Sequence, residues 1–185
     1  GVVARLSALF AVDAFAGGFV IQCLLAFWFY LRFGISEAVL GSVFFVANLL
    51  AGASALLASR LAARFGLINT MVFTHLPSNI LLCLVPFMPS LPWALAVLLV
   101  RFTISQMDVP TRQSYTMAVV DPDERSAASG VTTIARSLGA ALSPALSGGL
   151  LALSMHAPFL LAGGLKIIYD LALYRSFKAL KPEEE

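Results

Sequence analysis

Residues 65–100 read FGLINTMVFTHLPSNILLCLVPFMPSLPWALAVLLV, a run of 36 residues without Asp, Glu, Lys or Arg. As a single α-helix this run would be ~54 Å long, at ~1.5 Å per residue. The hydrocarbon core of a bilayer is only ~30 Å thick. The run therefore predicts two membrane-spanning helices, and the turn between them is placed by Pro86, Pro89 and Pro92.

The composition of the whole chain is typical of a membrane protein. Of its 185 residues 59% are apolar and 12% are charged, and the mean hydropathy is +0.90. A soluble domain carries about 25% charged residues. These values exclude an ordinary soluble enzyme and a disordered chain, and a net charge of +2 gives no basis for a nucleic-acid partner.

Charge-free stretches and turn residues divide the rest of the chain in the same way. We expect an all-α membrane domain at residues 1–175 and a solvated cytoplasmic tail at residues 176–185. The six predicted spans are residues 6–31, 37–59, 67–87, 91–119, 126–153 and 158–174.

Small residues recur every four positions in the second and fifth predicted spans, where they would let helices approach closely in lipid. These ridges are Ala47, Ala51, Ala55 and Ser59 in one span, and Ala135, Gly139, Ser143 and Ser147 in the other. Because the ridges occupy equivalent places in two sets of three helices, they favour a 3+3 inverted repeat.

Basic residues are divided unevenly between the two ends of the predicted bundle. One end carries Arg5, Arg60, Arg64, Arg112, Arg125, Arg175, Lys178 and Lys181, and the other end carries only Arg32. Basic loops remain in the cytoplasm. We therefore predict a multi-pass protein of the cytoplasmic membrane with both termini in the cytoplasm.

The charged residues inside the predicted spans include Asp13, Arg101, Asp108, Arg136, Lys166 and Asp170. A charge at the centre of a bilayer costs ~2.5–3.5 kcal/mol on insertion scales. These side chains should therefore face the bundle interior or a water-filled cavity. Asp13 is a candidate proton site, solute contact or arginine counter-ion. Lys166 and Asp170 are spaced to pair with each other, and the lone His75 and His156 are given no role.

The fourth predicted span carries a polar stripe if it is one continuous helix. Residues within about 80° of one another on its surface are Arg101, Ser105, Asp108, Arg112 and Tyr115. The stripe favours the wall of a solute pathway. The alternative is a chain of structural ion pairs that includes Asp108–Arg112.

Motifs for catalysis are absent from the sequence. It contains no HExxH, GxSxG or Walker A motif and no His/Cys cluster with metal-ligand spacing. We therefore predict no enzyme activity, no cofactor and no metal site.

Three segments resemble signatures of the major facilitator superfamily. Residues 59–66, SRLAARFG, resemble the family's 2–3 loop, Gly-x-Leu-Ala-Asp-Arg-x-Gly, with Arg64 and Gly66 matched and Ala63 in place of Asp. Arg101 and Ser105 resemble the fourth-helix Arg-x-x-x-Gly. The spacing of the fifth-helix antiporter motif is matched by Gly130, Gly139, Ser143, Pro144 and Gly148.

The resemblance implies a fold and a function. The degraded loop signature resembles that of the C-terminal six-helix half of a twelve-helix transporter, so the missing N-terminal half would be a partner. Helices 1 and 4 would line the cavity, helices 2 and 5 would flank the other half, and helices 3 and 6 would lie outside. The whole protein would move a small solute by alternating access, and the fifth helix favours proton-coupled efflux.

Within this resemblance Asp13 and Asp108 are candidate proton or cation sites, and Arg101 and Arg136 are candidate solute contacts. Two other readings stay open at this point. One is a stand-alone six-helix channel or membrane-embedded enzyme, and the other is a membrane assembly subunit without transport.

Overall fold

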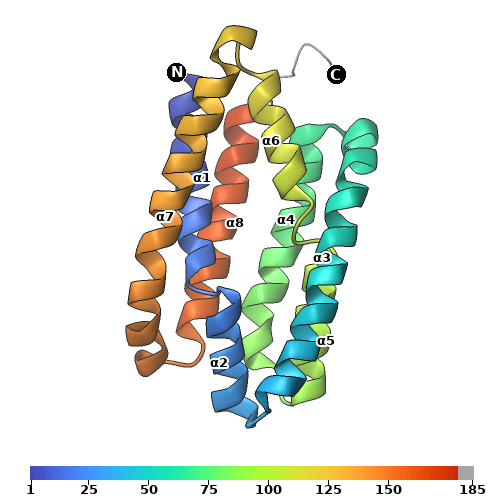
Figure 1. Cartoon of the computed structure of the whole chain (residues 1–185), viewed down its shortest axis with the longest axis vertical. Coiled ribbons are helices and arrows are strands. Elements are labelled where there is room, and N and C mark those ends of the chain that lie inside the picture. Colours follow the sequence, from blue (N-terminus) through green and yellow to red (C-terminus); the bar gives the residue numbers. More distant parts are fainter. Residues whose placement is uncertain (179–185) are drawn as a thin grey trace.

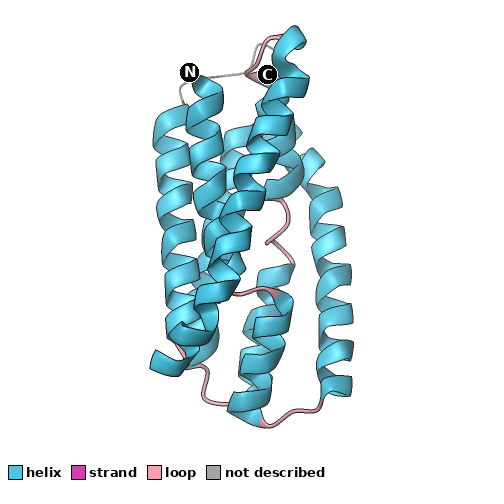
Figure 2. Cartoon of the chain, turned by 60° about the vertical axis from the view of Figure 1, so that its left-hand side comes forward, coloured by secondary structure: helices cyan, strands magenta, loops and turns pink. Residues whose placement is uncertain are grey.

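The computed structural model describes residues 1–178, and these form a bundle of helices without strands (Figures 1 and 2). The elements are α1 Val2–Gly18, α2 Gln22–Phe33, α3 Glu37–Phe65, α4 Leu67–Leu84, η1 Val85–Phe87, α5 Leu91–Phe102, α6 Asp108–Ala118, η2 Pro122–Glu124, α7 Arg125–Leu153 and α8 Ala157–Phe177. Most of the tail predicted at 176–185 lies outside the described residues.

Four segments of the described chain are long and apolar enough to cross a membrane: Val2–Phe33, Glu37–Phe65, Leu67–Phe87 and Ala157–Phe177. They correspond to the first, second, third and sixth predicted spans. The 29-residue α7 is not among them, and α5 is apolar but has only 12 residues. The chain is therefore an all-α membrane protein, while six spans and the inverted repeat stay predictions.

The fourth predicted span is not one continuous helix, so that expectation was wrong. α5 ends at Phe102, α6 begins at Asp108, and turns fill residues 103–107. Pro110 contributes to the break, because its ring lacks an N–H and clashes with the carbonyl group four residues earlier, at Gln106. The predicted stripe therefore holds only along α6, where Asp108, Arg112 and Tyr115 are all buried.

The first predicted span is also interrupted, between Gly18 and Gln22. Ile21 is extended, with φ −60° and ψ 156°, and two consecutive glycines before it weaken the helix. Gly18 is also required for packing. A Cβ at this position would collide with the Ser143 hydroxyl of α7.

The small-residue ridge of α7 packs against α1 of the same chain. A Cβ at Gly139 would collide with the backbone carbonyl of Ala11, and Gly139, Ser143 and Ser147 are all buried. The helix continues through Pro144. Two other motif glycines, Gly130 and Gly148, have open space where a Cβ would lie. In α3 the ridge is buried at Ala47 and Ala51, less so at Ala55, and exposed at Ser59.

The short turn between α3 and α4 depends on a glycine. Gly66 has φ +85°, in the left-handed region that side chains disfavour. Its neighbour in the loop signature, Arg64, is exposed and places its guanidinium over the ring of Phe65.

Two hydrophobic clusters occupy opposite ends of the bundle and leave the middle for polar groups. One is built around Trp28 and Phe159, and the Trp28 indole N–H donates a hydrogen bond of 2.8 Å to the Met155 carbonyl. The other includes Leu6, Tyr115 and Phe177 and joins the start of α1 to the end of α8.

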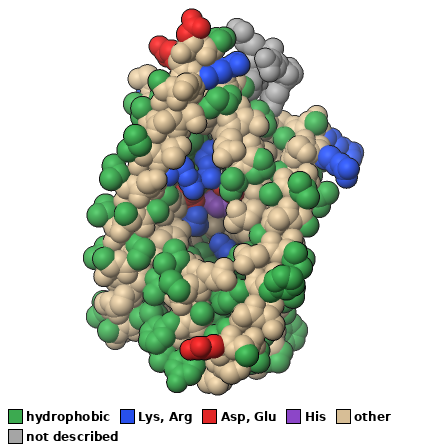
Figure 3. Space-filling model, viewed as in Figure 1, with side chains coloured by type: hydrophobic (Ala, Val, Ile, Leu, Met, Phe, Trp, Pro, Cys, Tyr) green, Lys and Arg blue, Asp and Glu red, His purple; other side chains and the backbone are tan. Residues whose placement is uncertain are grey.

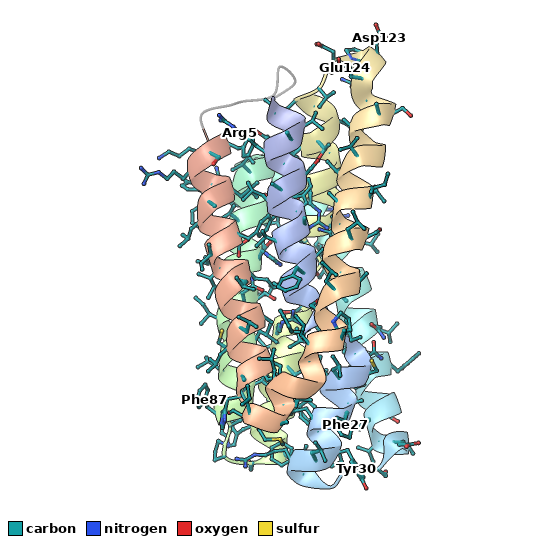
Figure 4. The ribbon with its side chains drawn as sticks, turned by 90° about the vertical axis from the view of Figure 1, so that its left-hand side faces the viewer. Arg5, Phe27, Tyr30, Phe87, Asp123 and Glu124 are labelled. Atoms are coloured by element: carbon teal, nitrogen blue, oxygen red, sulfur yellow. The ribbon has the colours of Figure 1, made fainter. Side chains whose placement is uncertain are left out.

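The start of α1 and the end of α8 lie at the same end of the bundle (Figure 1). Arg5, Asp123 and Glu124 are also at this end, whereas the exposed aromatic residues Phe27 and Tyr30 lie at the other (Figure 4). The sequence-based charge count needs one correction, because Arg112 is buried inside the bundle and is not a loop residue.

The predicted orientation can be tested by labelling single cysteines with a membrane-impermeant maleimide, after Cys23 and Cys83 are replaced by serine. We expect cysteines at Ser36 and Ser90 to react from outside intact cells, because both positions lie in turns at the end without the termini. A cysteine at Asn69 should react only after the cells are opened. Reaction of Asn69→Cys from outside would contradict cytoplasmic termini.

Candidate functional site

A buried carboxylate on α1 is the centre of an ion network in the middle of the bundle. Asp13 is 3% exposed and is contacted by Lys166 Nζ at 2.5 Å, Arg136 Nη1 at 3.1 Å, Arg112 Nη1 at 3.3 Å and His75 Nε2 at 3.8 Å. These four side chains come from α8, α7, α6 and α4. Five helices therefore converge on one carboxyl group.

The network lies beneath a hollow in the face shown in Figure 1. The space-filling view shows Lys or Arg, Asp or Glu, and His side chains gathered at mid-height in this hollow, within a largely hydrophobic surface (Figure 3). A charged cluster at this depth is expensive unless its members are paired. The contacts to Asp13 supply that pairing.

The expected Lys166–Asp170 pair is not formed. Lys166 instead reaches across to Asp13, and Asp170, which is fully buried, accepts hydrogen bonds from His75 Nδ1 at 2.8 Å and Asn79 Nδ2 at 2.9 Å. A pair four residues apart on one helix gains only ~0.2–0.5 kcal/mol. Tertiary contacts to buried partners therefore decide the arrangement, and α8 contributes to the interior as well as to the outside.

His75 was missed as a member of the network. Its ring lies between two carboxylates, with Nδ1 on Asp170 and Nε2 facing Asp13. The available signal in the sequence was Asn79, because residues four apart share one helix face. A histidine and an amide on one face of an otherwise apolar span indicate a buried polar partner.

The Asp108–Arg112 pair of α6 is present, at 2.7 Å. Both side chains are buried, and the same Nη1 of Arg112 also contacts Asp13. The Arg112 guanidinium lies 5.5 Å from the centre of the Phe10 ring, which is a cation–π geometry. The structure thus brings together four of the predicted site residues, Asp13, Asp108, Arg112 and Arg136.

The remaining predicted site residues are Arg101, Ser105 and Tyr115, of which Arg101 is close enough to Asp108 and Asp13 to interact electrostatically with both carboxylates. Arg101 forms no ion pair within the described part of the chain, and its guanidinium lies over the ring of Phe102 at 5.4 Å. Its buried Nε and the Ser105 hydroxyl have no hydrogen-bond partner among the described residues. Tyr115 is fully buried in the cluster around Leu6.

A polar pocket of about 650 Å³ adjoins the network between α6 and α7. Its volume suits a small solute, because ligand pockets commonly measure about 300–1,000 Å³. Arg112 and Arg136 line it together with Gln113 and five hydroxyl side chains: Thr116, Ser129, Thr132, Thr133 and Ser137.

A second cavity, of about 520 Å³, lies between α3, α4 and α8. Its lining is mainly apolar and includes Leu61, Phe65, Phe73 and Tyr174, with no charged residue. This second cavity does not reach the ion network. The pocket between α6 and α7 is therefore the stronger candidate for a functional site.

Apolar helices that enclose a buried ion network, with a polar pocket beside it, define a multi-pass membrane protein with an internal site. A family model described as Major Facilitator Superfamily matches residues 6–185, so the chain belongs to this superfamily. The chain is also 26% identical, over 175 residues, to an uncharacterized membrane protein of Saccharomyces cerevisiae. The match covers 93% of this chain and 39% of that protein, so the chain spans about two fifths of its relative's length.

Proposed function

We propose that this chain is one half of a secondary transporter that moves a small solute by alternating access, with the Asp13 network as its coupling site. The observation that carries the proposal is the contact of one buried carboxylate with cationic groups on three other helices and a histidine on a fourth. The membership of the major facilitator superfamily supports it, because members of that family are generally transporters rather than enzymes.

Asp13 is suited to coupling because its charge holds helices together. As a carboxylate it attracts Lys166 on α8 and Arg136 on α7, whereas protonation removes that attraction. A change that favours one arrangement of helices over another shifts the population between them. Protonation of Asp13 would therefore change which arrangement of α1, α7 and α8 is preferred.

The partner in this proposal is the N-terminal six-helix half of the same transporter. The outer face of α7 exposes a row of leucines, with Leu138 64% and Leu142 65% exposed. The greater length of the yeast relative supports a further membrane domain. The proposed direction of transport, efflux, is supported only by the spacing of the motif along α7. The ion network itself is suited to proton coupling in either direction.

Asp108 provides the first test, in vesicles that contain the full-length transporter and a trapped pH-sensitive dye. Asp108→Asn should abolish proton-driven accumulation of solute but leave part of the solute exchange, because asparagine resembles the protonated acid. Arg101→Ala should weaken both activities. Asp121→Asn, at an exposed turn, is the control. Full accumulation by Asp108→Asn would contradict a coupling role for Asp108.

A further inference from the structure

We infer that the pocket between α6 and α7 binds the anionic group of the solute, a carboxylate, phosphate or sulfate, and that this group competes with Asp13 for Arg136. The inference rests on the proposed function for its place in a transport cycle. The binding itself can be measured without transport.

The Arg136–Asp13 ion pair presents its cationic member to the pocket. The Arg136 side chain is 33% exposed and lines the pocket, whereas the Asp13 side chain that balances it is 4% exposed and does not line it. Arg112 lines the same pocket, and no acidic residue does. The cationic side of the network therefore faces the pocket, and its carboxylates face the interior of the bundle.

Polar side chains follow the face of α7 that borders the pocket. Ser129, Thr133, Arg136 and Ser137 line the pocket, and their spacing of four, seven and eight residues places them on one helix face. Ser129, Thr133 and Ser137 are exposed, as is Gln113 across the pocket on α6. A guanidinium surrounded by hydroxyl and amide donors is a suitable site for an oxyanion, which accepts hydrogen bonds from all of them.

Asp13 and a bound anion would compete for the guanidinium of Arg136. Asp13 contacts Arg136 through Nη1 at 3.1 Å, and a solute oxyanion would take the place of this carboxylate. Protonation of Asp13 removes the competitor, so proton and anion should each promote binding of the other. Two ligands that bind together travel together, and the inference therefore predicts cotransport of anion and proton in the same direction.

The test is protection of Arg136 from phenylglyoxal, which modifies guanidinium groups, in the purified full-length transporter. Sulfate, phosphate and succinate serve as probes, and the uncharged succinamide is the matched control. The anions should slow modification of Arg136 by about fivefold or more, read by mass spectrometry of its peptide. Modification of the exposed Arg60, at the end of α3, should not change.

The competition with Asp13 is tested in the same assay. In Asp13→Asn the sulfate concentration for half-protection should fall about tenfold, because the competing carboxylate is gone. If this variant does not fold, the double variant Asp13→Ala with Lys166→Met should show the same fall, since it also lacks the competing carboxylate.

The outcomes separate this inference from the proposed function. Equal protection by succinamide, or none by any of the three anions, would overturn the anion site even if the vesicles show proton-coupled transport. A half-protecting sulfate concentration that is unchanged when Asp13 is replaced would overturn the competition. Protection by anions in a protein that transports nothing would leave the site standing and contradict the transporter.

Discussion

Replacing Asp13 with alanine should lower the free energy of unfolding by about 3–5 kcal/mol, the cost of breaking a buried ion pair. The main reason is Lys166, which is 8% exposed and would keep its charge without the partner at 2.5 Å. Arg112 would keep its ion pair with Asp108, and Arg136 is partly exposed to solvent. Both arginines would therefore lose less favourable electrostatic energy than Lys166. The measurement is the thermal unfolding midpoint of the full-length protein in detergent.

Two variants control this experiment. Asp13→Ala combined with Lys166→Met should recover most of the lost stability, because it removes the charge left without a partner. Asp121→Ala, at the exposed turn before η2, should change stability by less than about 0.5 kcal/mol. If Asp13→Ala is as stable as Asp121→Ala, Asp13 does not hold the network together.

Gly139→Leu should also destabilise the protein, for a steric reason. The new side chain would meet the Ala11 carbonyl, which is backbone and cannot turn aside. α1 and α7 would have to separate, and overpacking of this kind costs ~1–3 kcal/mol or more. The measurement is the yield and unfolding midpoint of the full-length protein.

The matched control for this variant is Gly164→Leu on α8. It is the same chemical change within a helix, at a glycine with open space where a Cβ would lie. We expect little loss of yield or stability from it. Equal tolerance of the two variants would show that α1 and α7 do not pack as closely as the structure places them.

Features of the fold that depend on neighbouring residues could be predicted from the sequence. The charge-free run at residues 65–100 predicted two helices separated by a turn, and the structure places α4 and α5 there, of which only α4 with η1 is long enough to span a membrane. The four-residue spacing of Gly139 and Ser143 indicated a close helix contact, and the structure places it against α1. The Asp108–Arg112 pair was also visible, because both residues lie on one helix.

Features that depend on contacts between distant segments could not be predicted. Lys166 has an acid four residues away, yet it pairs with Asp13, which is 153 residues distant. Local spacing gives no information about which helices become neighbours. The convergence of side chains on Asp13 and the contacts of His75 therefore could not be predicted from local sequence. The break before Asp108 is an intermediate case, because Pro110 accounts for a disturbance of the helix at this point but not for five residues of turn.

Proton movement in vesicles of full-length Asp13→Asn tests the central claim most directly. Vesicles with a trapped pH-sensitive dye are given gradients of anionic, cationic and neutral solutes, and Asp121→Asn is the control. We expect at least one solute to move protons in the wild type and the control, and Asp13→Asn to lose that proton movement while it still exchanges the solute. Proton movement at the wild-type rate in Asp13→Asn, or none in the wild type with any solute, would contradict the account.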